Sequence, residues 1–293
     1  MNWQRGLKGR VKAQESLSRR TTFKIGGLAE FFVEPRDSAD LKLLILAAKS
    51  SKVPILVIGA GSNILVSDRG VKAIVLRLNA TLFKRISYSR NVMEAGSGLM
   101  LGHLILAAGN HGLSGLEFLA GIPGTVGGAL AMNAGAWGRS ISDLVEKVRV
   151  MDYNGTTKTL GRKDIKFAYR RCSLTGYIIL SARLKLVKKT KKEINENIKK
   201  FLGYRRNTQD TSLPNAGCIF KNPPANSAGR LIDLCGLKGK RIGGACVSQR
   251  HANFILNQGN ASAGDVLKLM RLIRKRVKDK FKVTLEPEIK IWG

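Results

Sequence analysis

The stretch of sequence that decides the fold is residues 121–135, which reads Gly-Ile-Pro-Gly-Thr-Val-Gly-Gly-Ala-Leu-Ala-Met-Asn-Ala-Gly. It is rich in glycine and carries no charged side chain. A solvated linker would be polar, and each glycine inside a helix costs about 1 kcal/mol relative to alanine. The stretch therefore predicts a loop whose backbone bends sharply or lies against a flat or charged ligand. A cofactor that carries phosphates is the simplest such ligand, and a glycine turn packed in a core is the alternative.

Two other glycine stretches follow predicted strands. Residues 59–64 read Gly-Ala-Gly-Ser-Asn-Ile, and residues 96–98 read Gly-Ser-Gly. The first begins like a dinucleotide-binding fingerprint, but Ile64 replaces the third glycine and no helical pattern follows at once. Backbone N–H groups and the Ser62 hydroxyl can nevertheless hold a pyrophosphate. Together, the three glycine loops predict a large, extended cofactor with phosphates.

The composition is that of an ordinary globular protein, with 293 residues and 44% hydrophobic side chains. This length accommodates two domains or one large one. The basic N-terminus is not followed by an apolar run, which argues against a secretory signal, and no stretch is long enough for a membrane span. The four cysteines show no Cys-x-x-Cys spacing, so we predict neither a metal site nor a disulfide framework. These features favour a reducing, cytoplasmic location.

The net charge of +31 is unusual and favours anionic partners, such as nucleic acid, an acidic membrane surface or small anions. Basic residues 268–282 have helical spacing, with Lys and Arg opposite an apolar stripe, which indicates a solvated helix face first. Aromatic residues make up only 6% of the chain, too few for base-stacking platforms. We interpret the charge mainly as a compositional bias of the lineage and keep a nucleic-acid-binding protein as an alternative.

Hydrophobic periodicity predicts alternating strands and helices. A helix beginning near Asp37 lies between strands 31–33 and 54–58, the latter taken as buried, and a strand at 71–78 completes a small βαβ unit. Further on we predict strands at 86–88, 92–95, 148–150, 177–187 and 289–292, and a turn at Asn154-Gly155. We also predict three helices. The first carries Leu101, Leu104, Ile105 and Ala108, the second carries Ile194, Ile198 and Phe201, and the third is the basic run 268–282. The lysine-rich stretch 188–192 indicates a boundary before a C-terminal unit.

Several motifs, taken in order, give this chain a marked similarity to one family. They are residues 21–27, 59–65, 121–135, 169–170, 215–223, 236–239, 251–254 and 286–288. With these motifs, the chain from about Ser18 onward resembles the UDP-N-acetylenolpyruvoylglucosamine reductases, flavoenzymes that complete UDP-N-acetylmuramic acid for peptidoglycan synthesis. The resemblance implies an α+β fold with an FAD-binding domain of the vanillyl-alcohol-oxidase (PCMH) type at 18–188, built from subdomains at about 18–78 and 79–188. A smaller α+β substrate domain at 189–293 would follow.

The resemblance also implies FAD as the cofactor and NADPH as its reductant. The enolpyruvyl ether of UDP-N-acetylglucosamine enolpyruvate would take a hydride from flavin N5 at C3 and a proton at C2. The implied FAD-binding residues are Gly59, Ala60, Gly61, Ser62, Asn63, Gly98, Gly121, Ile122, Pro123, Gly124, Gly127, Gly128, Asn133, Ala134 and Gly135.

Three residues match the family's catalytic positions: Arg170, Cys218 and Glu288. Hydride addition places negative charge on an enolate, which a cation and an acid at Arg170 and Glu288 would stabilise as it develops. Cys218 stands where the family often has a serine that donates the proton, and a thiol is more acidic than a hydroxyl. From the residues alone, a surface charge, a strand-edge carboxylate and a small buried hydrophobic residue are the respective alternatives.

Substrate contacts are implied at Tyr169, Arg206, Lys221 and Asn222. Gln209 falls where some relatives carry lysine, and Asp210 replaces an expected proline, so the geometry of that loop departs from the pattern. His251 is interpreted as a structural hydrogen-bonding residue. We expect a monomer that binds the enolpyruvyl sugar and NADPH, with no metal, no nucleic acid and no membrane insertion. Another FAD oxidoreductase of the same fold, acting on a hydroxyacid or a sugar, is the alternative within enzymes.

Overall fold

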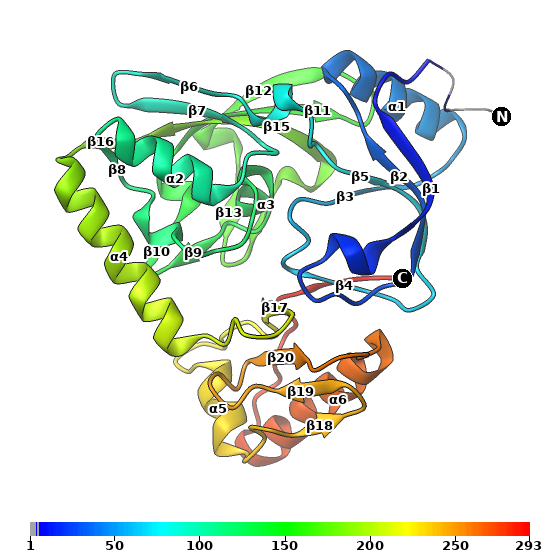
Figure 1. Cartoon of the computed structure of the whole chain (residues 1–293), viewed down its shortest axis with the longest axis vertical. Helices are drawn as coiled ribbons and strands as arrows, with labels where there is room; N and C mark the ends of the chain where they lie inside the picture. The colour runs from blue at the N-terminus through cyan, green and yellow to red at the C-terminus, as the bar shows by residue number, and fades with distance from the viewer. Residues whose placement is uncertain (1–3, 5) are drawn as a thin grey trace. The chain divides into compact units, whose positions relative to one another are not determined.

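The computed structural model describes residue 4 and residues 6–293, which form two compact units (Figure 1). The first unit contains the N-terminal residues up to Ala13, Phe31–Ala60 and Ala73–Tyr204. The second contains Gln14–Glu30, Gly61–Lys72 and Arg205–Gly293. The predicted functional domains, divided at residues 188 and 189, stay a prediction, and the packing units do not follow that boundary.

Hydrophobic packing explains why the two packing units differ from the predicted domains. Ile198 and Phe201, on helix α4 (Lys191–Thr208), pack against the core of the first unit. Conversely, Phe23, Ile25 and Leu65 lie in the core of the second unit, although they are far from its other residues in sequence. Because burial of apolar surface is the main force that holds a unit together, these side chains draw their segments across the expected boundary.

The first unit is built around a five-stranded antiparallel sheet with the order β12-β11-β15-β7-β6 (Figure 1). Its strands are β6 Ile86–Ser89, β7 Val92–Gly96, β11 Val145–Asp152, β12 Thr157–Gly161 and β15 Tyr177–Lys185. The predicted turn at Asn154-Gly155 joins β11 to β12, and Gly155 has a φ of +77°. The sequence alternates between apolar and polar residues along the strand predicted at 177–187, and this alternation is found from Leu180 to Lys185; Ile179 is also buried, where the pairing of β15 with β11 is irregular.

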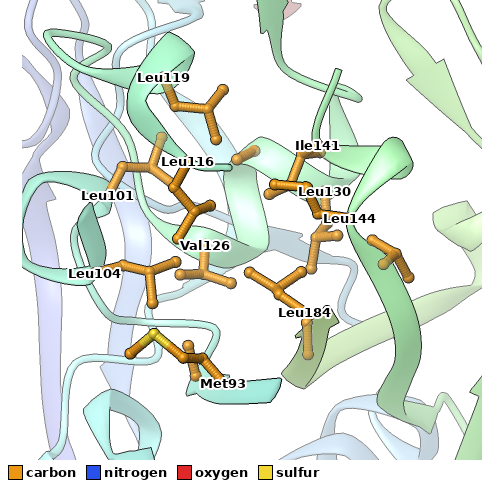
Figure 2. Close-up of a cluster of buried hydrophobic side chains, with 14 of the residues drawn as sticks. Met93, Leu101, Leu104, Leu116, Leu119, Val126, Leu130, Ile141, Leu144 and Leu184 are labelled. Carbon is orange, nitrogen blue, oxygen red and sulfur yellow. The ribbon is translucent and has the colours of Figure 1, made fainter. Parts of the chain in front are cut away.

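The glycine stretch 121–135 differs from the predicted loop because it contains a short helix, α3 (Val126–Ala131). Thr125 caps this helix, its Oγ1 accepting a hydrogen bond from Gly128 N at 3.2 Å. Val126 and Leu130 point from α3 into the same cluster as Leu101 and Leu104 of α2 (Leu101–Asn110) (Figure 2). Burial of these side chains offsets the poor helix propensity of the glycines.

A second sheet contains β1 (Arg10–Ser16), β2 (Leu28–Glu34), β5 (Val71–Leu76) and β3 (Ile55–Val57), in that order. Asp37 caps α1 (Ser38–Ser50), whose Leu41, Leu44 and Ile45 pack with Ile74 and Leu76. β3 and β5 are parallel, although the segment between them contains β4 (Ile64–Val66) and no helix, and α1 instead links β2 to β3. The prediction of a buried strand at 54–58 was wrong, because β3 lies at the edge of the sheet and Val57 is 41% exposed.

The second unit contains a four-stranded antiparallel sheet with the order β17-β20-β19-β18. The strands are β17 Asn215–Cys218, β18 Arg241–Ile242, β19 Ala245–Val247 and β20 Phe254–Asn257, and the helices are α5 Ala228–Leu234 and α6 Ala263–Phe281. β21 (Lys290–Trp292) pairs in parallel with β4 (Ile64–Val66). The remaining pairs are two-residue strands: β8 Leu113–Ser114 with β16 Val187–Lys188, β9 Gly135–Ala136 with β10 Arg139–Ser140, and β13 Phe167–Ala168 with β14 Arg171–Cys172.

Helix α6 has the predicted division between a buried apolar stripe and an exposed basic face. Val266, Leu269, Met270, Ile273 and Val277 are buried, while Lys268, Arg271, Lys275 and Lys278 are exposed. In the part of the chain that the structure describes, no helix is long and apolar enough to cross a membrane.

The first turn of α6 depends on a carboxylate that is distant in sequence. Asp68 accepts hydrogen bonds from Ala263 N at 2.8 Å and Gly264 N at 3.1 Å. We expect Asp68→Ala to lower the free energy of unfolding by about 1–2 kcal/mol, because two amides of the helix N-terminus lose their acceptors. Chemical denaturation followed by circular dichroism measures this change. Asp279→Ala is the control, since its exposed ion pair with Lys275 contributes at most about 1 kcal/mol. Coincident curves for Asp68→Ala and the native protein would contradict the prediction.

Candidate functional site

Two of the three glycine loops are joined by backbone hydrogen bonds in the first unit. Gly127 N donates to Ser97 O at 2.8 Å, and Val126 N donates to Leu99 O at 2.9 Å. Leu101 N in turn donates to Gly124 O at 2.9 Å. Residues 96–101 and 124–127 therefore form one continuous backbone surface.

The absence of side chains at two glycines lets the loops approach this closely. A Cβ on Gly59 would lie 2.6 Å from Thr125 Oγ1, and a Cβ on Gly127 would lie 2.9 Å from Ser97 Cβ. Both distances are shorter than van der Waals contact. Gly59, Ser97 and Thr125 thus bring all three glycine loops together, and such a cradle of backbone suits the pyrophosphate of a dinucleotide. The residues present therefore fit FAD.

The first glycine loop is divided between the units. Gly59 and Ala60 belong to the first, whereas Gly61, Ser62 and Asn63 belong to the second. Gly61 O accepts a hydrogen bond from Thr22 N at 3.1 Å. Asn63 is bound to the C-terminal segment by two hydrogen bonds: its Nδ2 donates to Glu288 O at 3.2 Å, and its carbonyl accepts from Lys290 N at 2.9 Å. A predicted cofactor-binding residue is thus attached to the predicted catalytic glutamate.

The close contact at Gly127 leads to a stability prediction with a matched control. We expect Gly127→Ala to destabilise the protein by about 1–3 kcal/mol and to lower its FAD content, because the new methyl group overlaps the Ser97 turn. Gly102→Ala, in α2, meets no atom within 4 Å and should instead stabilise by about 0.5–1 kcal/mol. Thermal unfolding and flavin absorbance of the purified variants measure both effects. Equal behaviour of the two variants would contradict this account of the loop.

Tyr169 and Arg170 form the two-residue turn between β13 and β14. Arg170 adopts a left-handed φ of +58°, and its Nη1 donates to Gly135 O at 3.0 Å. Asn133 fixes the same turn to the glycine stretch, since its Nδ2 donates to Ala168 O at 3.1 Å. The structure therefore attaches the predicted catalytic arginine directly to the end of stretch 121–135.

Cys218 and Glu288 are brought together in the second unit. Cys218 ends β17 and pairs with Phe254 of β20. The next residue, Ile219, accepts a hydrogen bond at its carbonyl from Glu288 N at 2.8 Å. Cys218 is half-buried, and so is Glu288. The two predicted acidic groups thus lie on adjacent backbone segments of one unit, while Arg170 belongs to the other.

The predicted substrate contacts have structural roles of their own. Lys221 Nζ lies 3.1 Å from Glu286 Oε2, so an anionic substrate would compete with this ion pair. Asn222 Oδ1 accepts from Ala228 N at 3.0 Å, at the start of α5. Arg206 is exposed on the last turn of α4, and its carbonyl accepts from Arg250 Nη1 at 3.1 Å.

Asn253 is the main residue that the sequence analysis overlooked. Its side chain is buried and forms hydrogen bonds with both backbone groups of Phe220, as a neighbouring strand would. Oδ1 accepts from Phe220 N at 3.0 Å, and Nδ2 donates to Phe220 O at 2.8 Å. A polar amide between apolar residues was the available signal.

Near Asn253, His251 Nδ1 accepts a hydrogen bond from Asn253 N at 3.3 Å, and burial lowers the pKa of the imidazole, which favours the neutral, accepting form. The interpretation of His251 as structural is consistent with this contact.

Known proteins match this chain over nearly its whole length. Residues 208–292 match the family model "UDP-N-acetylenolpyruvoylglucosamine reductase, C-terminal domain", and residues 29–161 match the model of an FAD binding domain. The chain is 43% identical to UDP-N-acetylenolpyruvoylglucosamine reductase 2 of Symbiobacterium thermophilum, over 97% of this chain and 93% of that protein. The chain belongs to the UDP-N-acetylenolpyruvoylglucosamine reductase family. The family resemblance of its sequence motifs is therefore confirmed.

Other members of the reductase family agree with this assignment. The reductase of Chloroherpeton thalassium is 43% identical, over 98% of this chain and 94% of its own length. Among solved structures, the reductase from Thermus caldophilus superposes with a TM-score of 0.83 at 37% identity, covering 98% of this chain and 100% of that one. The α+β fold, with an FAD-binding domain and the C-terminal domain of this reductase family, is thereby confirmed.

Proposed function

We propose that this chain reduces the enolpyruvyl ether of UDP-N-acetylglucosamine enolpyruvate to the lactyl ether of UDP-N-acetylmuramate, with NADPH as the reductant. The observation that carries the proposal is the full-length similarity to named reductases, which includes both matched domains. FAD, when bound by the glycine loops, would supply the redox chemistry, the relay of a hydride from NADPH to C3 of the enolpyruvyl group. The convergence of the glycine loops in the first unit supports FAD binding there.

The chain's own residues hold the cofactor and handle charge and protons. We propose that the FAD-binding residues are the glycine loops named above, whose backbone would line the phosphates. Arg170 offers a guanidinium to the enolate that hydride addition creates, and Glu288 helps to stabilise the same charge. Cys218 Sγ donates its proton to C2, which completes addition across the double bond. The attachment of Arg170 to Gly135 and of Glu288 to Ile219 supports these roles.

Tyr169, Arg206, Lys221 and Asn222 are proposed to bind the UDP-sugar. Its phosphates and carboxylate require cations and amide donors, which these side chains supply. The ion pair of Lys221 with Glu286 keeps the ammonium group partly exposed and able to exchange one carboxylate partner for a phosphate.

We further propose that the protein acts as a monomer in the cytoplasm, without insertion into the membrane. The support for this location is chemical, because NADPH and nucleotide sugars are its proposed substrates. Size-exclusion chromatography with light scattering tests the monomer.

Stopped-flow absorbance of the flavin tests the function. The purified protein should be yellow, NADPH should bleach the flavin absorption, and UDP-N-acetylglucosamine enolpyruvate should restore it without oxygen. Bleaching by NADPH without restoration by the enolpyruvyl sugar would favour another FAD oxidoreductase. A colourless protein that binds DNA with a steep salt dependence would contradict the flavoenzyme altogether.

A further inference from the structure

The loop between α4 and β17 is held by the side chain of Asp210. Asp210 Oδ1 accepts from the Ser212 hydroxyl at 2.6 Å, and Oδ2 accepts from the Ser248 hydroxyl at 2.9 Å. Hydrogen bonds from Ser212 and then from Ser248 lower the pKa of the Asp210 carboxyl, assisted by the charge of Arg250. Asp210 is therefore an ionised acceptor at neutral pH, and hydrogen bonds to ionised groups are the stronger ones.

A first chain of hydrogen bonds leads from the Asp210 backbone to the residue before Cys218. Asn215 Nδ2 donates to Asp210 O at 3.1 Å, and Asn215 Oδ1 accepts from Gly217 N at 2.9 Å. Between Asn215 and Cys218 the pairing of β17 with β20 is irregular, and Gly217 has a φ of +73°. Such a bulge changes the direction of the side chain that follows it. Here that side chain is the Cys218 thiol.

A second chain leads from the Asp210 side chain to the strand opposite Cys218. Ser248, which is fully buried, donates its hydroxyl to Asp210, and its backbone N donates to Phe254 O at 2.9 Å. Phe254 is the cross-strand partner of Cys218. The Ser248 hydroxyl also accepts from Arg250 N and His251 N, so its orientation is fixed by three partners.

The two chains meet at Cys218 and make a closed ring. We propose that Asp210 is a positioning residue whose carboxylate, through Ser248, and whose backbone carbonyl, through Asn215, fix the bulge presenting the Cys218 thiol; replacing its side chain cuts the Ser248 path. The catalytic effect of this positioning rests on the proposed function, whereas the hydrogen-bond geometry does not. Because proton transfer falls steeply with misplacement of the donor, loosening the ring should slow protonation without weakening cofactor binding.

The test compares Asp210→Ala and Ser248→Ala with Asp233→Ala in the full-length, FAD-loaded protein. Asp233 is in the same unit, and its exposed side chain forms an ion pair with Lys238 at 2.7 Å. We expect the two ring variants, Asp210→Ala and Ser248→Ala, each to lower the limiting rate of flavin reoxidation by roughly 10- to 100-fold. Flavin reduction by NADPH and the half-saturating concentration of the enolpyruvyl sugar should stay at native values. The double variant should be no slower than the slower single variant, and Ser248→Thr, which keeps the hydroxyl, should recover most of the rate.

A second readout does not depend on turnover. Alkylation of Cys218 by iodoacetamide, followed by peptide mass spectrometry, should accelerate in Asp210→Ala and Ser248→Ala but not in Asp233→Ala. If both ring variants show native rates of Cys218 alkylation and of flavin reoxidation, the proposal is overturned. If Asp210→Ala does not fold, the milder Asp210→Asn and Ser248→Ala give the same readouts. If Cys218→Ala reoxidises at the native rate, the proton-donor role fails, and the alkylation rates alone decide whether the ring positions the thiol.

Discussion

Replacing Cys218 by alanine is expected to leave flavin reduction by NADPH intact and to slow flavin reoxidation by the enolpyruvyl sugar by roughly 10²- to 10⁴-fold. The reason is that alanine offers no proton to C2, whereas the remaining residues still bind the cofactor and the substrate. Anaerobic stopped-flow measurements separate the two half-reactions. The half-buried position of Cys218 at the end of β17 gives the thiol both a fixed place and access to a ligand.

Two variants serve as controls for this result. Cys235→Ala removes the other half-buried thiol of the second unit and should reoxidise at the native rate. Cys218→Ser keeps a proton donor and should retain much of the activity while losing sensitivity to alkylating reagents. Fast reoxidation of Cys218→Ala would refute the assignment.

Arg170→Lys is expected to slow reoxidation by about 10²- to 10³-fold, because one stabilising donor at the developing charge is lost. Lysine keeps the positive charge but not the planar fork of donors, so it cannot contact Gly135 O and the substrate at the same time. Flavin content should be unchanged, since the glycine loops are intact. The effect should appear in the limiting rate measured with saturating enolpyruvyl sugar.

Arg171→Lys provides the matched control for the arginine. Arg171 is the next residue along the hairpin and is exposed on β14. Its replacement should leave both half-reactions at native rates. An equal loss in the two variants would mean that the placed guanidinium of Arg170 has no special role compared with that of its exposed neighbour.

Most elements of the fold were predictable from the sequence because their local signals and their burial agree. The alternation in β15, the cap at Asp37 and the Asn154-Gly155 turn each point to the structure that tertiary packing also stabilises. The short helix α3 was missed because local propensity was overruled: Val126 and Leu130 lie in the core, and Gly127 must approach Ser97. Propensity alone contains neither of these long-range contacts.

The candidate site was predictable in part. Family motifs identify Arg170, Cys218 and Glu288, and the structure adds how each backbone is held. What the sequence could not reveal are the partners: that Asn63 contacts Glu288, or that Asn253 pairs with Phe220. These contacts join segments separated by 225 and 33 residues, a distance at which no spacing rule applies.

The composition of the second unit has a consequence for the newly made chain. Phe23, Ile25 and Leu65 leave the ribosome early, yet many side chains of the same core, such as Val266 and Leu285, are translated much later. At typical elongation rates of about 5–20 residues per second, these apolar side chains wait on the order of ten seconds or more for their partners. During that interval they are candidates for chaperone binding, and a message truncated before Val266 would yield a chain whose core lacks the whole apolar stripe of α6.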